Sequence, residues 1–332
     1  MQPHVAQQVR TMRLSGQIRG TSTLPLSMQA FANMRNLKTL CIEGDIFAKP
    51  EDPVKNQFVD IRVKMDICHL EINPRRMTNT NYAVGFLLRS MEQDPRFDFT
   101  DILEYNNYTY DSATILTLAL HVPSVVSFSQ LRLSRLRDPE LTIVRPRAQS
   151  YRLLCEFLHA HAKIEHLAID YQNVLNTHTA PTINLADVHE VFTPATLPRL
   201  RTFRGSSQSF YALVKAKLGS LTRLRRLNLG SSHTHPEEQA AFGRLVQELQ
   251  SSPIRLGGLK ALSIQLSLNA LDVTDHLGRL CGGTVEDWFG HLPHTIDESV
   301  STKAVAVFKP VTTLRVIHFC YDSAWFLGGL SR

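Results

Sequence analysis

Two histidine-rich segments contain residue types that could bind a zinc ion. They are HAHAKIEH, with His159, His161 and His166, and HTHPEE, with His233, His235 and Glu237. A zinc site needs three or four converging ligands and further hydrogen bonds that orient each imidazole. His159 and His161 lie two residues apart near an expected helix end, so their side chains diverge, and Pro236 is expected to open a helix. We therefore predict no metal site and no cofactor.

Residues that could carry catalysis are scarce. The sequence contains no glycine-rich phosphate loop, no GxSxG and no HExxH. The acid pairs Asp101 with Glu104 and Asp297 with Glu298 show no partner arrangement that their spacing alone can support. Exposed acids in loops or at helix starts are the better interpretation. We predict no catalytic residues and a chain that is not an enzyme.

Two groups of arginines raise the question of nucleic-acid binding. They are Arg132, Arg135, Arg137, Arg145 and Arg147, and Arg199, Arg201, Arg204, Arg223, Arg225 and Arg226. Nucleic-acid binding needs cations that face one way, with aromatic residues for unpaired bases. Here many arginines adjoin apolar strand positions, and few aromatic residues stand between them. The net charge of +6 is modest. A solvated basic surface is favoured, and a nucleic-acid-binding solenoid is kept as the alternative hypothesis.

The composition is that of a globular protein. Of 332 residues, 43% are hydrophobic and 20% are charged, which excludes a wholly disordered chain. There is no run of about 18 apolar residues, and residues 1–20 have no continuous apolar stretch, so we expect neither a membrane span nor a secretory signal. The five cysteines are far apart and odd in number, which favours reduced thiols. We expect a cytoplasmic or nuclear protein.

One short phrase recurs along the chain: an apolar residue, two residues, an apolar residue, one residue, an apolar residue. Six clean copies are NLKTLCI from Leu37, ICHLEI from Ile67, KIEHLAI from Ile164, RLRRLNL from Leu224, GLKALSI from Leu259 and TLRVIHF from Leu314. Weaker copies start at Val9, Phe97, Val125 and Leu200. The first intervals, 28 to 30 residues, lie close to the leucine-rich repeat length. The last interval, 55 residues, is expected to hide a degenerate unit.

The phrase predicts a short strand that buries one face. A single strand cannot bury that face alone, so neighbouring copies stack in parallel, and each return crossover is usually helical. Helices are expected at Ala83–Met91, Ala113–His121, Tyr151–Leu158, Phe210–Leu218 and Glu237–Leu249. We predict an α/β leucine-rich repeat solenoid, a curved horseshoe with strands on the concave face and helices outside. Residues 1–332 would form a single irregular domain of about ten to eleven units.

Several segments resemble the leucine-rich repeat region of fungal F-box/LRR-type proteins. In LPRLRTFRGSSQSFYALVKAKLGSLTRLRRLNL, Leu197–Leu229, a strand leads to a serine-rich turn, a brief helix and a second strand. The opening VRTMRLSGQI, followed by MRNLKTLCI, is similar to the first repeats after an F-box in that family. The resemblance implies the substrate-recognition part of a ubiquitin ligase subunit. Repeat-like sequence begins at Val9 without an F-box, so we expect the chain alone not to bind the ligase adaptor.

The residues that alternate with the apolar positions would form the concave binding face. These candidate partner-binding residues are Arg13, Glu43, His69, Glu71, Asp101, His166, Asp170, Arg204, Arg226, Asn228 and His318. Their first half is mostly acidic and their second half mostly basic. We predict a protein partner on this face, without nucleic acid or membrane. The C-terminal tail, with Trp325, Phe326 and Leu327, is expected to cover the end of the core.

Overall fold

The chain is represented by a computed structural model. It describes residues 3–15, 34, 36–43, 68–73, 110–112, 115–122, 131–143, 148–171, 193–230, 236–251, 256–265, 284–291, 302, 313–321 and 324–329. The chain forms two compact units, residues 1–163 and 164–332, which are described one after the other. That all 332 residues form a single domain stays a prediction.

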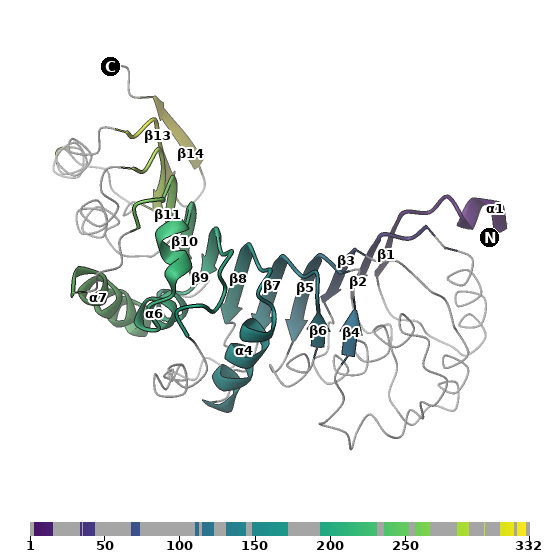
Figure 1. The fold of residues 1–332 in the computed structure, drawn as a ribbon. Coiled ribbons are helices and arrows are strands. Elements are labelled where there is room, and N and C mark those ends of the chain that lie inside the picture. The colour runs from purple at the N-terminus through teal and green to yellow at the C-terminus, as the bar shows by residue number, and fades with distance from the viewer. Residues whose placement is uncertain are drawn as a thin grey trace. The chain divides into compact units, whose positions relative to one another are not determined.

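The first unit is built on a parallel sheet. Its strands pair in the order β1 (Thr11–Ser15), β2 (Thr39–Glu43), β3 (His69–Asn73), β5 (Thr117–Val122) and β7 (Asp138–Ile143), which Figure 1 shows side by side. A second parallel pair is formed by β4 (Tyr110–Ser112) and β6 (Leu131–Leu133). The helices among the described residues of this unit are α1 (Pro3–Ala6) and α4 (Ala148–Ala160). The expected helix at Tyr151–Leu158 is confirmed by α4.

The apolar residues of the phrase are buried in this unit, as the sequence predicts. Leu40, Leu70 and Leu118 are register partners on β2, β3 and β5, and all three are fully buried. The residues next to them along each strand, such as His69 and Glu71 on either side of Leu70, are part-exposed. Because side chains alternate along a strand, one face of the sheet is core and the other is accessible.

One prediction for the first unit is wrong, and two others fall outside the described residues. The helix predicted at Ala113–His121 is wrong, because β5 occupies Thr117–Val122. Its apolar residues fit the strand phrase as well as a helical spacing. The copies predicted at Phe97 and Val125 lie outside the described residues.

The second unit continues the same design over more strands. β8 (His166–Tyr171), β9 (Thr202–Gly205), β10 (Arg226–Gly230), β11 (Ala261–Gln265), β12 (Asp287–His291) and β13 (Val316–Tyr321) pair in parallel in chain order. β14 (Ala324–Gly329) then pairs antiparallel with β13 and covers its outer edge. One buried row runs through Leu167, Phe203, Leu227, Leu262 and Trp288. Each unit is therefore an α/β leucine-rich repeat solenoid.

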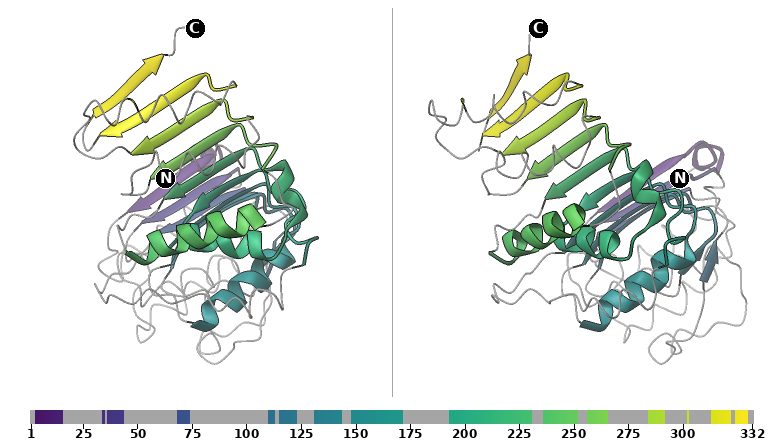
Figure 2. Two further views of the ribbon diagram at one scale, coloured as in Figure 1. Left: turned by 90° about the vertical axis from the view of Figure 1, so that its left-hand side faces the viewer. Right: turned by 60° about the vertical axis from the view of Figure 1, so that its left-hand side comes forward.

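The helices of the second unit lie on the core side of its sheet. They are α6 (Ser207–Lys215), the 3-10 helix η5 (Gly219–Arg223) and α7 (Pro236–Ser251), which confirm two predicted helices. The ring of Phe210 on α6 lies 5.2 Å from that of Phe203, between centroids, and Phe203 belongs to the buried row. Lys215 on α6 binds Glu248 on α7 at 2.9 Å, and Figure 2 shows these two green helices side by side. No described helix is long and apolar enough to cross a membrane.

The same pair of backbone hydrogen bonds links neighbouring repeats where each strand begins. The carbonyl of the residue before a strand accepts N–H groups from two residues of the next repeat. The Arg201 carbonyl accepts from Arg225 at 2.7 Å and from Arg226 at 3.1 Å, and the Arg225 carbonyl accepts from Lys260 at 2.8 Å. These hydrogen bonds place the residues that precede neighbouring strands next to one another, in a column. This column contains Glu165, Arg201, Arg225, Lys260, Glu286 and Arg315.

Candidate functional site

The accessible face of the second unit is the surface that its helices leave open. Because α6 packs on the buried row, the alternate strand residues face the other way. Two rows of register partners form this face. The first contains His166, Thr202, Arg226, Ala261 and Asp287, and the second contains Ala168, Arg204, Asn228, Ser263 and Phe289. All of these residues are exposed or part-exposed, so we call this surface the exposed face of the second unit.

Four arginines gather at the start of β9 and β10. Arg201, Arg204, Arg225 and Arg226 are all exposed, and we call them the arginine group. The Arg225 N–H donates to the Arg201 carbonyl, which makes these two residues neighbours across the strands. Arg204 pairs in register with Asn228, two residues beyond Arg226. Arg204 and Arg226 belong to the two rows of the exposed face, and Arg201 and Arg225 lie immediately before the same two strands.

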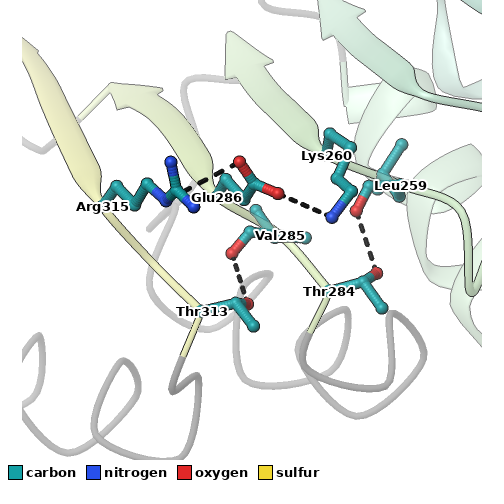
Figure 3. A network of polar contacts seen from close by, with 7 residues as sticks. All are labelled: Leu259, Lys260, Thr284, Val285, Glu286, Thr313 and Arg315. Atoms are coloured by element: carbon teal, nitrogen blue, oxygen red, sulfur yellow. Dashed lines mark hydrogen bonds and ion pairs between the residues drawn. The ribbon is translucent and has the colours of Figure 1, made fainter.

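Acidic residues border the arginine group on both sides along the column before the strands. Glu165 precedes Arg201, and Glu286 follows Lys260. Glu286 accepts a hydrogen bond from the Lys260 ammonium at 2.6 Å, and Arg315 lies 3.8 Å from its other oxygen (Figure 3). The Lys260 hydrogen bond and charge, followed by the Arg315 charge, hold the pKa of the Glu286 carboxyl below its ordinary value. The positive charge of Lys260 is therefore engaged within the chain.

A second polar cluster lies on the corresponding face of the first unit. Cys41 on β2 is the register partner of Glu71 on β3, and Arg13 on β1 is the register partner of Cys41. His69 lies two residues before Glu71, on the same face of β3. One side-chain ligand atom from each of Cys41, His69 and Glu71 lies within 4.8 Å of the others.

The Cys41 thiol sits in an environment that favours its protonated form. Burial raises its pKa above the ordinary value, and the hydrogen bond and negative charge of Glu71 raise it further. The charge and hydrogen bond of Arg13 act in the opposite direction. Cys41, Cys68 and Cys155 are reduced and form no disulfide among the described residues. Cys41 is therefore a reduced thiol held between a cation and an acid.

His161, part of the first histidine-rich segment, has a structural role. It is buried, its Nε2 accepts the Leu133 N–H at 2.9 Å, and its Nδ1 lies 2.6 Å from the Phe157 carbonyl. Nδ1 therefore carries the proton and donates it, which leaves neither ring nitrogen for a metal. His159 is exposed at the end of α4, and His166 belongs to the second unit. His233 and His235 lie outside the described residues.

The structure places the predicted partner-binding residues as follows. Arg13, His166, Arg204 and Arg226 are exposed, and His69, Glu71 and Asn228 are part-exposed. Glu43, Asp170 and His318 lie on β2, β8 and β13, where the strand position alone is described. Asp101 lies outside the described residues. His166 Nδ1 lies 2.9 Å from the Thr202 hydroxyl, across β8 and β9.

The sequence analysis did not bring together the two clusters that the structure shows. Arg201 and Arg225 were noted as basic residues but were not assigned to the binding face. The sequence predicts that the cysteines are reduced, but it does not predict the hydrogen bond between Cys41 and Glu71. The signal was present in the repeat register, because Cys41 and Glu71 hold the same place in NLKTLCI and ICHLEI.

Comparison with known proteins adds little to this picture. No protein-family model matches the chain, and no curated protein matches it. One similar solved structure is an internalin, inlF, from Listeria monocytogenes strain 4b F2365. The two chains are 12% identical, the alignment covers 96% of this chain and 83% of the internalin, and the TM-score is 0.38. At these values the likeness carries no information about function.

Proposed function

We propose that this chain is a non-enzymatic scaffold that binds a partner protein on its exposed strand face. The arginine group is the observation that carries the proposal. Arg204 and Arg226 are exposed on the face opposite the described helices, and Arg201 and Arg225 are exposed immediately before the same two strands. The parallel sheet holds the backbone of these residues in place, so little backbone conformational entropy is lost on binding. The partner segment would be acidic, because carboxylates match the fork of N–H donors on arginine.

The bordering residues favour a short acidic segment of a protein over nucleic acid. Glu165 and Glu286 interrupt the basic column on either side of the arginine group, and Asp287 stands on the exposed face three strands from Arg204. A nucleic acid needs a longer cationic track for its phosphates and stacking side chains for its unpaired bases. An acidic stretch of a few residues fits the four arginines and avoids the acids beside them.

A peptide-display selection against the purified chain tests this function. The probe is a random peptide library, and we expect the enriched peptides to contain clustered Asp and Glu. In the double variant Arg204→Ala/Arg226→Ala these peptides should lose about tenfold or more in affinity, which corresponds to about 1.4 kcal/mol or more. The matched control is Arg152→Ala/Arg244→Ala, which removes two exposed arginines from α4 and α7. This control should bind as the unchanged chain does.

Two results would contradict the proposal. Acidic peptides that bind the double variant and the unchanged chain equally would remove the arginine group from the site. A single-stranded oligonucleotide that binds more tightly than any selected peptide, with affinity falling steeply as salt rises, would favour the nucleic-acid alternative.

The resemblance to fungal F-box/LRR-type proteins supports a narrower version of the proposal. In that version the bound protein is the substrate of a ubiquitin ligase, and the scaffold presents it to the enzyme. The F-box recruits the ligase adaptor in that family, so we expect the purified chain alone not to bind the adaptor. The genomic sequence immediately upstream of Met1 tests the ligase role. An in-frame F-box would support it, and an in-frame stop codon there would contradict it without affecting the scaffold function.

A further inference from the structure

We infer that Cys41, His69 and Glu71 form a zinc-binding site on the accessible face of the first unit. The three side chains offer a thiol sulfur, an imidazole nitrogen and a carboxylate oxygen, and the three ligand atoms lie within 4.8 Å of one another. Ligands at about 2.0–2.3 Å from one tetrahedral ion are separated by less than this. A small closing movement of side chains would therefore bring all three onto one ion.

The donor set fits zinc better than the hard cations. Calcium and magnesium prefer oxygen ligands, whereas a thiolate and an imidazole are typical ligands of zinc. Cys41 would bind as the thiolate, and its proton would pass to the solvent. Three protein ligands leave the fourth tetrahedral position for a water molecule or for a side chain of a bound protein.

The two strands that carry the ligands are held firmly. Cys41 and Glu71 are register partners on β2 and β3, which fixes their Cα atoms opposite one another. The His69 N–H donates to the Lys38 carbonyl at 3.0 Å, at the start of the same pair of strands. Leu40 and Leu70, each next to a ligand, are fully buried in the core. The backbone is therefore set before an ion arrives, and only side chains must adjust.

Arg13 opposes cation binding at this site. It is the register partner of Cys41, and its charge and hydrogen bond act on the thiol. A guanidinium beside the ligands repels a divalent ion and competes for Cys41. Replacing Arg13 with Met removes that charge and keeps most of the volume of the side chain. Arg13→Met should therefore bind the metal more tightly than the unchanged chain.

Cobalt(II) titration of the full chain, prepared without a histidine tag and under reducing conditions, tests the site. Tetrahedral cobalt bound to a thiolate gives visible d–d bands and a near-ultraviolet charge-transfer band. We expect these bands to saturate at one ion per chain and to disappear when zinc is added. Cys41→Ser should abolish the charge-transfer band. His69→Gln should weaken metal binding by more than about 100-fold, which exceeds the loss expected for a residue that only orients a metal ligand. Cys68→Ser, the matched control, removes a neighbouring cysteine thiol that is not among the three ligands and should bind normally.

The site is excluded if the unchanged chain gives no charge-transfer band, or if Cys41→Ser gives the same band. A band that depends on Cys68 instead of Cys41 also overturns it. Circular dichroism of each variant shows whether it is folded, and part-exposed His69 gives a second variant should Cys41→Ser fail to fold. Tighter binding by Arg13→Met supports the geometry, and weaker binding contradicts it. None of these readouts depends on the arginine group of the second unit.

Discussion

The indole ring of Trp288 occupies the space that any side chain at Gly290 would need. A Cβ atom built on Gly290 would overlap the six-membered part of the indole ring. Gly205 on β9 is also crowded, since a Cβ there would lie 2.7 Å from the Ile169 carbonyl oxygen and 3.0 Å from Phe203 Cζ. In both strands a large ring at the second apolar position of the phrase is matched by a glycine at the third. The pair fills the volume that two aliphatic residues fill elsewhere.

Gly290→Ala should therefore destabilise the chain. The new methyl group forces the Trp288 ring out of its position in a buried row, and overpacking of this kind costs about 1–3 kcal/mol. The free energy of unfolding, measured by urea denaturation, should fall by that amount.

Two further variants separate this effect from a general loss of backbone freedom. In Trp288→Leu/Gly290→Ala the smaller side chain makes room, so the added methyl should cost less than it does in the presence of Trp288. Gly243→Ala adds a methyl in α7 at an exposed position where no atom lies within 4 Å. It should raise stability by about 0.5–1 kcal/mol, because alanine favours a helix more than glycine does. Equal effects of Gly290→Ala with and without Trp288 would contradict the packing argument.

His161 should make the stability of the chain depend on pH. Burial, with a smaller effect from the Arg132 charge, lowers its pKa below the ordinary value, although the Phe157 hydrogen bond acts in the other direction. The native state therefore prefers the neutral ring, and the unfolded chain takes up a proton first as pH falls. The free energy of unfolding should decrease from the ordinary histidine pKa, about 6.5, down to the lower native pKa, and then level off.

Denaturation of the unchanged chain and of His161→Gln at a series of pH values measures this effect. The variant should lose about 1–3 kcal/mol at neutral pH, since it leaves the Leu133 N–H or the Phe157 carbonyl without its partner. Its stability should also depend less on pH between 6.5 and the lower native pKa. His159→Gln, which changes an exposed histidine, is the control and should keep the full pH dependence.

Lys217 has a left-handed backbone conformation that glycine would adopt more easily. Lys217 follows α6 and has a φ of 54°. The Leu218 N–H donates to the Leu213 carbonyl, and the Lys217 N–H donates to the Val214 carbonyl. This is the hydrogen-bond pattern that usually ends a helix at glycine. Lys217→Gly should raise the free energy of unfolding by about 0.5–1 kcal/mol, because the relief of strain exceeds the added freedom of the unfolded chain. A lower melting temperature would contradict this.

The low pKa of the Glu286 carboxyl should depend on Lys260. In Lys260→Met the hydrogen bond and the nearest positive charge are lost, so this pKa should rise toward its ordinary value of about 4.3. Carbon-detected NMR titration of the glutamate carboxyl groups measures it directly. Lys215→Met, which removes an ammonium from α6 that pairs with Glu248, should leave the Glu286 pKa unchanged. An unaltered pKa in Lys260→Met would show that Lys260 does not cause the shift.

Much of the strand pattern could be predicted because each clean copy of the phrase has a fixed strand chemistry. The six clean copies correspond to β2, β3, β8, β10, β11 and β13. The other strands depart from the phrase in identifiable ways, and β12 is the degenerate unit expected in the 55-residue interval. In β12 the third apolar position is Gly290, and in β7 the second is Pro139. In β5 the apolar residues fit a helix as well as a strand, and only pairing with β3 decides between them.

The repeating strand, its buried face and the residue types of the opposite face can be read from the amino-acid sequence. This is possible because alternation along a strand is a local property of the backbone. The tertiary structure alone decided which exposed residues meet. Cys41 lies opposite Glu71, and Arg225 lies beside Arg201, because hydrogen bonds between strands set the register across segments of unequal length. Register depends on contacts between distant parts of the chain, so the spacing of residues within one repeat does not contain it.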